Sequence, residues 1–318
     1  MKKIGLLLIL CAAVGAPAQQ STPARDQSTP AGTLPTNLNF PVERIVAPTN
    51  SDLYCAGFVT KNLLPNVNFV AGGLDTPSTT NYGDGEIVYL NGKGYELGKR
   101  YSVVRELRDP NRYETYRGQF AMLKTMGQPY SELGIVRVVD TRSRSAVAQV
   151  EFSCSPILPG DLVTPFVERA NIAFHTAMRF DRFAPPNGKA SGRIVLARDF
   201  DTELGAGSKV YLNLGGNQGI KPGDYLRAVR SYEADLHDPV DSLSFKASTE
   251  DDTQARPPSV EKSMLTSSKG PTIHVADLPR RAVGEIVILS TTPTTSTGMI
   301  VFAMEDVHIG DVVELDPQ

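Results

Sequence analysis

Hydrophobic residues in this chain fall in short runs bounded by glycine, proline, aspartate or serine. Several runs alternate apolar and polar positions, as AVAQVEF at 146–152 does, which is typical of a strand with one face in a core. The pattern predicts strands at 86–91, 101–107, 134–140, 145–152, 209–213, 225–230, 284–289 and 298–304. Gly-Asp turns at 160–161 and 310–311 are each expected to lead into a further strand.

The same succession of segments occurs twice. Residues 88–91 (VYLN) match 210–213, and 133–163 align without a gap to 283–313. The alignment also places the segment around Gly57 opposite that around Gly192. A repeat of this length indicates tandem domains, because solenoid repeats are much shorter. We therefore predict a mostly β fold of two tandem small β-barrel or sandwich modules that arose by internal duplication, joined by a short linker helix.

The expected organisation follows from composition and periodicity along the chain. Apolar residues at helical spacing predict a helix over 167–178, and a second short helix is expected at 119–126. A polar stretch in the second module predicts a disordered surface loop, the alternative being a binding loop that orders on contact. The predicted parts are a signal peptide at 1–18, a Pro/Ser/Thr-rich disordered leader at 19–51, module 1 at 52–166, a linker at 167–189, and module 2 at 190–318 with its insertion at about 242–272.

The first residues have the pattern of a secretory signal peptide. Two lysines precede an apolar run at 5–15, and Ala16-Pro17-Ala18 offers the small residues of a cleavage site. A lipoprotein signal with Cys11 as the lipidated residue is the alternative, but Leu10 stands where a small residue is expected. No later stretch approaches the ~20 apolar residues of a membrane-spanning helix. We expect an exported protein, either periplasmic or extracellular.

Removal of the signal peptide leaves two of the 3 cysteines, Cys55 and Cys154. In an oxidising compartment such a pair predicts one disulfide, although two free thiols are the alternative. In the alignment Cys55 faces Ala190 and Cys154 faces Met304, so both cysteines are absent from module 2. This joint absence favours a bridge between the first strand and a late strand of module 1.

Charge and motifs narrow the function classes. A net charge of -3 gives no electrostatic reason to expect nucleic acid or anionic lipid as a partner. None of the 4 histidines has a second histidine at metal-ligand spacing, and no nucleophile elbow or phosphate-binding loop occurs. The glycine-rich run at 214–219 is interpreted as a turn. We predict no catalytic, cofactor-binding or metal site.

Acidic residues could form a glycosidase pair, since that chemistry needs only two facing carboxylates. The candidates by position are Asp84, Glu86, Asp161, Asp224 and Asp311. Asp161 and Asp311 occupy equivalent turns, which favours a structural role. The predicted structural turn residues are Gly98, Gly160, Asp161, Gly223, Asp224, Gly310 and Asp311.

Aromatic residues could instead form a sugar-binding platform. The candidates are tyrosines at positions 95, 101, 113, 116, 130, 225 and 232. Several of them stand at alternating strand positions and the chain has no tryptophan, so packing in the core or at a sheet edge is favoured.

The run VYLNLGGNQGIKPGDYLRAVR, the Asp238-Pro239 pair, VGEIVILSTTPTTSTGMIVF and the closing IGDVVEL together resemble the C-terminal domain of the flagellar assembly protein T family. The resemblance covers about 190–318 and, more loosely, 55–166. It implies a small β-domain and a structural role in the periplasm. The family's other domains and the LysM pattern of related wall-binding proteins are not evident, so neither a flagellar nor a wall-binding role is implied.

These observations together predict an exported, non-catalytic structural or interaction protein of the cell envelope, with envelope proteins as its partners. The alternative is a glycan- or peptidoglycan-binding protein, which needs exposed aromatic side chains converging on one groove. A hydrolase built from the carboxylates named above is a third hypothesis.

Overall fold

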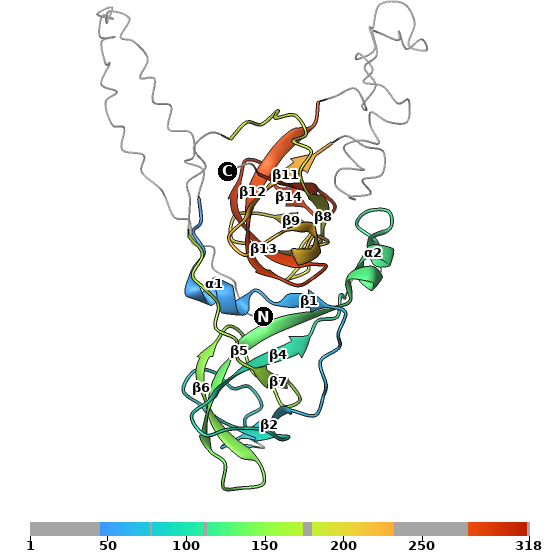
Figure 1. Cartoon of the computed structure of the whole chain (residues 1–318). Coiled ribbons are helices and arrows are strands. Elements are labelled where there is room, and N and C mark those ends of the chain that lie inside the picture. The colour runs from blue at the N-terminus through green and yellow to red at the C-terminus, as the bar shows by residue number, and fades with distance from the viewer. Residues whose placement is uncertain (1–44, 77, 111–112, 174–179, 232–278, 317–318) are drawn as a thin grey trace, which may run out of the picture. The chain divides into compact units, whose positions relative to one another are not determined.

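The computed structural model describes residues 45–76, 78–110, 113–173, 180–231 and 279–316. The fold is mostly β and contains two closed antiparallel barrels of six strands each (Figure 1). The predicted signal peptide and most of the predicted leader, at 1–44, lie outside the described residues, as does the insertion at 242–272.

Barrel 1 follows the strand order β5-β4-β7-β2-β3-β6 and closes through pairing of β5 with β6. A short additional strand, β1 (Phe58–Thr60), pairs with the start of β5 outside the closed ring. Helix α1 (Asn50–Cys55) precedes β1, and α2 (Gln119–Met126) connects β4 to β5. The barrel strands are β2 (Phe69–Gly73), β3 (Ile87–Asn91), β4 (Arg100–Glu106), β5 (Gln128–Asp140), β6 (Ala146–Ser153) and β7 (Leu162–Pro165).

Barrel 2 follows the order β10-β13-β12-β11-β15-β8. A separate two-stranded ribbon joins β9 (Glu203–Leu204) to β14 (Val307–His308), and a 3-10 turn, η1 (Gly216–Gln218), follows β10. The barrel strands are β8 (Ser191–Ala197), β10 (Lys209–Leu212), β11 (Tyr225–Arg230), β12 (Arg281–Thr291), β13 (Ser296–Ala303) and β15 (Val312–Leu315).

The two strand orders are the same when β2, β3, β4, β5, β6 and β7 are replaced by β8, β10, β11, β12, β13 and β15. The irregularities coincide as well. The register of β4 against β5 shifts between Val103 and Val104, and that of β11 against β12 shifts between Ala228 and Val229. Shared bulges at aligned positions indicate common descent, because bulges are conserved features of a fold. The prediction of two tandem β-barrel modules is confirmed.

One part of the sequence alignment is wrong. Strand β8 takes the place of β2, since each pairs with the strands that follow it and with the last strand of its barrel. Gly192 therefore has no equivalence to Gly57, which lies just before β1 and outside the closed ring. The alignment at 55–59 matched a short Gly-containing pattern, whereas β2 (FVAGG) escaped recognition because glycine is a weak strand former.

Strands β12 and β13 are covered on both faces. Ile286 and Ile300 lie in the barrel interior, while Val287 and Val301 belong to a second apolar cluster on the outer side. This explains why the runs VGEIVIL and GMIVF are apolar at nearly every position, whereas apolar and polar residues alternate along much of β6 in barrel 1.

The outer cover is provided partly by the segment between the barrels. Residues 167–173 were predicted as part of a helix, but the structure places them in non-helical backbone, and 174–179 lie outside the described residues. Ile172 and Phe180 pack against the outer cluster, and the Phe180 ring meets Phe302 edge-on at 5.1 Å between centroids. Residues 167–173 therefore form an irregular strap across the outer surface of barrel 2.

Folded structure begins earlier than expected. The predicted leader extends to residue 51, yet the Val46 amide donates a hydrogen bond to the Val301 carbonyl at 2.9 Å. Helix α1 begins at Asn50 and has a capping box formed by Thr49 and Asp52.

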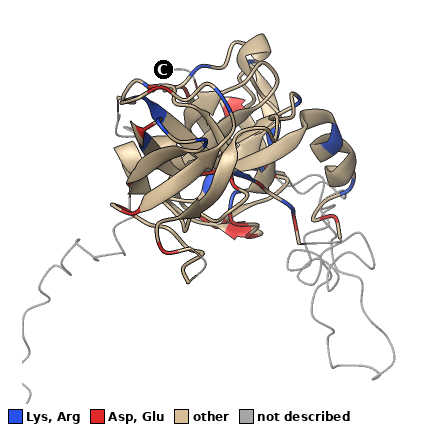
Figure 2. Ribbon diagram, turned by 90° about the horizontal axis from the view of Figure 1, so that it is seen from below, with Lys and Arg blue, Asp and Glu red and all other residues tan. Residues whose placement is uncertain are grey.

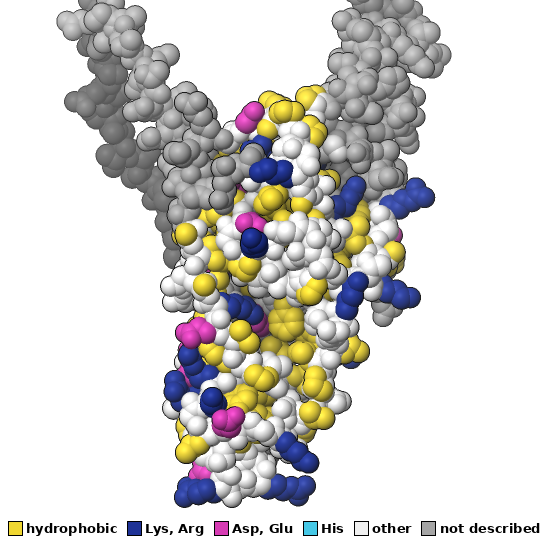
Figure 3. All heavy atoms as spheres, viewed as in Figure 1, with side chains coloured by type: hydrophobic (Ala, Val, Ile, Leu, Met, Phe, Trp, Pro, Cys, Tyr) yellow, Lys and Arg dark blue, Asp and Glu magenta, His cyan; other side chains and the backbone are white. Residues whose placement is uncertain are grey.

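The surface carries both charge signs without segregation, as Figure 2 shows for the ribbon. On the face seen in Figure 3, apolar side chains form small groups between Lys/Arg and Asp/Glu side chains. Within the described ranges, no helix is long and apolar enough to cross a membrane.

Candidate functional site

The most elaborate group of buried polar contacts lies where the segment around β1 meets barrel 2. Three hydroxyl groups of barrel 2 donate hydrogen bonds to consecutive parts of this segment. Tyr211 Oη donates to the Ala56 carbonyl at 3.2 Å, Thr297 Oγ1 to the Gly57 carbonyl at 2.9 Å, and Thr295 Oγ1 to the Val59 carbonyl at 2.8 Å. All three donors are buried, so each bond satisfies a carbonyl that water does not reach. Burial raises the pKa of Tyr211, which keeps its hydroxyl protonated as a donor.

Gly57 is required at the centre of this contact. Its φ of 73° lies in the left-handed region, and a Cβ there would stand 2.4 Å from both the Tyr130 carbonyl and the Tyr211 hydroxyl. Its amide donates to Glu132 Oε2 at 3.1 Å. The backbone of β1 is thus held by barrel 1 on one side and by barrel 2 on the other.

Glu132 is a buried carboxylate of β5 that faces a partly buried arginine. Arg169 contacts both carboxylate oxygens, with Nη1 at 3.0 Å from Oε2, and also donates to the Leu53 carbonyl. Burial raises the pKa of Glu132, and the Arg169 charge opposes this effect. The pair therefore links β5, α1 and the strap between the barrels at one point.

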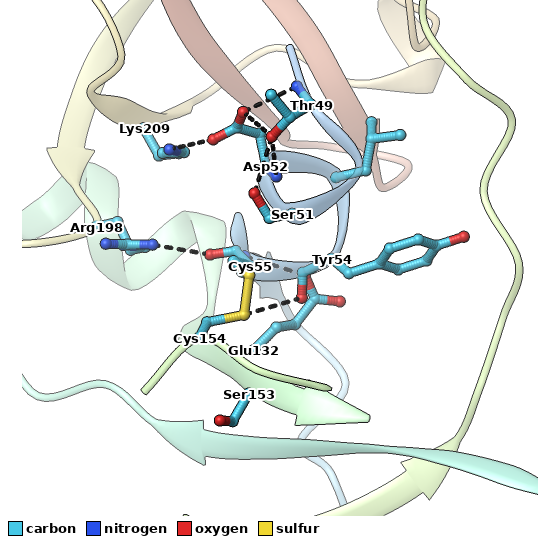
Figure 4. Close-up of a disulfide and its surroundings, with 12 residues drawn as sticks. Thr49, Ser51, Asp52, Tyr54, Cys55, Glu132, Ser153, Cys154, Arg198 and Lys209 are labelled. Atoms are coloured by element: carbon cyan, nitrogen blue, oxygen red, sulfur yellow. Dashed lines mark hydrogen bonds and ion pairs between the residues drawn. A yellow bond between two sulfur atoms is a disulfide. The ribbon is translucent and has the colours of Figure 1, made fainter. Parts of the chain in front are cut away.

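Helix α1 also contacts both barrels, as Figure 4 shows. Cys55 forms a disulfide with Cys154, which follows β6 of barrel 1, and the two Cα atoms are 5.9 Å apart. The Cys55 carbonyl accepts a hydrogen bond from Arg198 Nη1 at 3.0 Å, and Asp52 pairs with Lys209 at 2.5 Å; both basic residues belong to the barrel 2 region. Burial would raise the pKa of Asp52, but hydrogen bonds from Lys209 and Thr49 lower it overall.

The β4–β5 connection of barrel 1 makes further contacts with barrel 2. We call these contacts, together with those of α1 and the segment around β1, the junction. The Tyr116 side chain belongs to the apolar core cluster of barrel 2, with 2% of its surface exposed, and burial raises its pKa to about 12. Gln119, at the start of α2, donates from Nε2 to the Val195 carbonyl at 2.9 Å. Asn213 of barrel 2 places its amide nitrogen 3.3 Å from the Met122 sulfur. Barrel 2 is thus completed by residues of module 1.

An arginine–aspartate clamp recurs at the Gly-Asp turn of each barrel. Arg105 donates to both carboxylate oxygens of Asp161, at 2.7 and 2.8 Å, and Arg230 donates to both of Asp311, at 3.0 and 2.8 Å. Each aspartate also accepts from the amide three residues earlier, and each arginine also donates to a carbonyl of the same connection. These bidentate bonds hold the turn against the end of β4 or β11.

The two clamps differ in burial, which predicts different costs of breaking them. Side-chain exposure is 36% for Arg105 and 7% for Arg230. We expect Arg230→Met to lower the free energy of unfolding by about 2–3 kcal/mol, because both members of the Arg230–Asp311 pair are shielded from water, and Arg105→Met by about 1 kcal/mol, because water reaches the Arg105 side of its pair. Urea unfolding of both variants measures the difference. Equal losses would contradict the assignment of the cost to burial.

A surface groove adjoins the clamp of barrel 1. Its volume is about 580 Å³. The wall on one side is the connection between β1 and β2, where Leu63 is 72% exposed. The other walls are the ends of β4 and β7 with the Gly-Asp turn, and Tyr130 of β5. The lining is mixed in polarity, so the groove is suited to an extended segment or an apolar side chain.

The structure places the predicted turn residues in well-defined roles. Gly98 and Gly223 both have positive φ, 78° and 92°, and their amides donate to β5 and β12 respectively. Asp224 accepts from the Lys221 amide at 2.7 Å. Gly160 and Gly310 also have positive φ, 96° and 105°.

The candidate carboxylates each accept local hydrogen bonds. Asp84 accepts from the Ser153 hydroxyl at 2.6 Å, Glu86 from the Gly83 amide at 2.5 Å, and Asp161 and Asp311 from their arginines. In the part of the chain that the structure describes, no three Asp, Glu, His or Cys side chains gather as a metal site would require. His308 is buried in β14, whereas the other histidines lie outside the described residues.

The candidate tyrosines are distributed over different environments. Tyr101, Tyr116, Tyr130 and Tyr225 are buried, and Tyr95 packs edge-on against Tyr101 at 5.2 Å. Tyr113 is 86% exposed, and Tyr232 lies outside the described residues. Of the described tyrosines, Tyr130 lines the groove.

Sequence reasoning missed the residues that build the junction, namely Tyr116 as a core residue of barrel 2, Glu132, Arg169, Tyr211, Thr295 and Thr297. A signal existed for Glu132, which is a charged residue directly before the apolar run at 133–136. No periodicity links residues as distant as Gly57 and Thr297, so these contacts carry no sequence signal.

Comparisons with known proteins add no relative. No protein-family model matches the chain, and the curated proteins contain no match.

Proposed function

We propose that this protein is an exported, non-catalytic structural or interaction protein of the cell envelope, which holds two β-barrels in a fixed arrangement. The observation that carries the proposal is the junction, where module 1 completes the core of barrel 2 through Tyr116 and barrel 2 hydroxyls bind the backbone of 56–59. Such a junction resists independent motion of the barrels, because any separation would expose buried carbonyls and apolar surface.

The location rests on separate observations. The Cys55–Cys154 disulfide is compatible with an oxidising compartment, and the start of the chain has the pattern of a signal peptide. The resemblance of module 2 to the C-terminal domain of flagellar assembly protein T supports a structural role in the envelope.

In-cell crosslinking of the native protein, followed by mass spectrometry of the captured material, tests the proposal. Reproducible capture of one envelope assembly is expected. If no protein is captured and the purified chain binds cell-wall glycan, the scaffold role is wrong and the glycan-binding alternative replaces it. Tyr116→Ala, which weakens the junction, is expected to capture less of that assembly, and Tyr113→Ala, whose side chain is 86% exposed in the same connection, is the matched control.

A further inference from the structure

The β4–β5 connection of module 1 docks on one face of barrel 2. The Tyr116 ring lies over Gly310, where a Cβ would stand 2.9 Å from it, and Gln119 Nε2 donates to the Val195 carbonyl at 2.9 Å. Arg193 lies beside the ring, with its guanidinium carbon 5.8 Å from the ring centroid. This face is therefore made by two residues of β8 and by the Gly-Asp turn before β15, and it binds an aromatic ring and a side-chain amide three positions apart.

Barrel 1 has a counterpart of this face, and the strand register defines it. The register skips Val195 in β8 and Ala71 in β2, so both residues lie at the same bulge. Arg193 pairs with the first residue of β15, and Phe69 pairs with the first residue of β7. In each barrel the glycine of the Gly-Asp turn donates to the carbonyl of the residue between these two. It follows that Phe69 and Ala71 take the places of Arg193 and Val195.

The two faces differ in whether they are covered. Val195 and Gly310 are buried, whereas Ala71 and Gly160 are exposed. A Cβ placed at Gly160 would meet no described atom within 4 Å. The clamp beside the turn shows the same difference, since Arg105 is partly exposed and its counterpart in barrel 2 is buried. Barrel 1 therefore leaves uncovered the face that barrel 2 buries against the β4–β5 connection.

The residues of the uncovered face suit a protein segment better than a glycan or an anionic polymer. The groove of about 580 Å³ reaches the same turn at Gly160, so it offers room for a chain that continues past the face. Two arginines and two carboxylates line this groove, which leaves no net charge to select an anionic polymer. Stacking of a sugar requires an exposed aromatic ring, but Phe69 is half-buried and Tyr130, the aromatic residue of the groove, is buried. Phe69 instead offers apolar surface to a side chain that lies on the turn.

We propose that the face formed by Phe69, Ala71 and Gly160 binds a segment of an envelope protein that presents an aromatic side chain and, three positions later, a side-chain amide. The ring lies on Gly160 beside Phe69, and the amide donates to the backbone at the Ala71 bulge. This contact between proteins repeats the contact that Tyr116 and Gln119 make within the chain. The inference rests on the proposed interaction role, and it names the surface and the kind of segment that serve it.

A synthetic peptide with the sequence of residues 113–126, YETYRGQFAMLKTM, is the probe, because it contains the required spacing and the equivalent face of barrel 2 already binds it. Fluorescence anisotropy of the labelled peptide, titrated with the purified full chain, measures the affinity. Saturable binding is expected. The same peptide carrying Tyr116→Ala is expected to bind about tenfold more weakly or worse, because the ring is the anchor of the contact.

A substitution in the protein locates the site. Ala71→Arg places a long charged side chain on the face and is expected to weaken peptide binding by about tenfold or more. Val139→Arg is the matched control, since Val139 is 43% exposed and is also skipped by the register, but it lies in β5, opposite β2 in the ring of six strands. It should bind the peptide as the native chain does. Thermal unfolding midpoints equal to that of the native chain check that both variants are folded.

Absence of saturable peptide binding to the native chain would overturn the proposal. So would binding that Ala71→Arg leaves unchanged, because the peptide would then have replaced the chain's own connection on barrel 2. If soluble peptidoglycan fragments compete with the peptide for the native chain but not for Ala71→Arg, the face binds glycan and the assignment to a protein segment is wrong.

A photoreactive amino acid at position 71, compared with one at position 139, carries the test into the cell. Crosslinks from position 71 are expected to reach an envelope protein at a segment with the aromatic and amide spacing, and position 139 should capture none of it. An envelope assembly captured by the native protein but not through position 71 would contradict this inference and leave the proposed function standing. Peptide binding at the face without any captured envelope protein would contradict the proposed function instead.

Discussion

Tyr116→Ala is expected to lower the free energy of unfolding by about 3–5 kcal/mol, the range for removing a large aromatic side chain from a core. The tyrosine comes from module 1, but its ring is packed within barrel 2 and faces Gly310 and Arg193. Its removal leaves a cavity lined by the end of barrel 2 and detaches the support of Met122, whose sulfur lies 3.4 Å from the Tyr116 hydroxyl.

Urea unfolding followed by far-UV circular dichroism measures this loss. Tyr113→Ala is a matched control, because Tyr113 lies three positions earlier in the same connection and is 86% exposed. We expect it to change stability by less than about 0.5 kcal/mol. Similar small effects of the two substitutions would show that barrel 2 does not depend on module 1.

The second large effect is expected from the disulfide. Replacing Cys55 and Cys154 together by alanine should lower the free energy of unfolding by about 4–5 kcal/mol, since the bond closes a loop with a sequence separation of 99. The chain-entropy account assigns this to greater freedom of the unfolded state. The loss should come without a change of fold, because Asp52 and the Cys55 carbonyl keep their bonds to Lys209 and Arg198.

Comparison of oxidised and reduced native protein in urea gives the same quantity without substitution. The double variant serves as the control, because a reducing agent should not change its unfolding. If the native protein unfolds at the same urea concentration with and without the reducing agent, the bond does not stabilise the fold as expected.

The barrels could be predicted because their signals are local. Strand patterns at 86–91 and 146–152 and the Gly-Asp turns at 160–161 and 310–311 each depend on neighbouring residues, and they occur in the same order twice. Closure of β5 onto β6 and of β12 onto β13 follows from hairpins that are adjacent in sequence. Even the short helix α2 was expected at its observed bounds, Gln119–Met126.

The parts that failed depend on contacts between distant segments. The strap at 167–173 has helical apolar spacing, but its backbone forms hydrogen bonds with distant residues instead of with itself. The Arg169 amide, for example, donates to the Tyr54 hydroxyl. Cys55 was expected in a strand equivalent to the start of module 2, and it lies in α1 because the segment 50–60 was recruited to the junction. The disulfide pairing could still be predicted, because only two cysteines remain once the predicted signal peptide is removed.

The candidate site was beyond sequence reasoning for the same reason. The clamp arginines, Arg105 and Arg230, stand at aligned positions before connections of different length, but their partners are more than fifty residues away. Only the aligned aspartates indicated a shared structural role.

The strap over barrel 2 also sets an order of events for a chain that emerges from its amino terminus. Ile172 and Phe180 precede β12 and β13, whose outer faces they cover. The hairpin made by these strands is apolar on both faces, so it is prone to pair with another chain while its cover is missing. Because its cover is already present when it emerges, the hairpin can be shielded as soon as it forms. A shuffled chain with 281–303 placed ahead of the strap would expose the hairpin before its cover has emerged, and it is expected to aggregate during synthesis more than the native chain does.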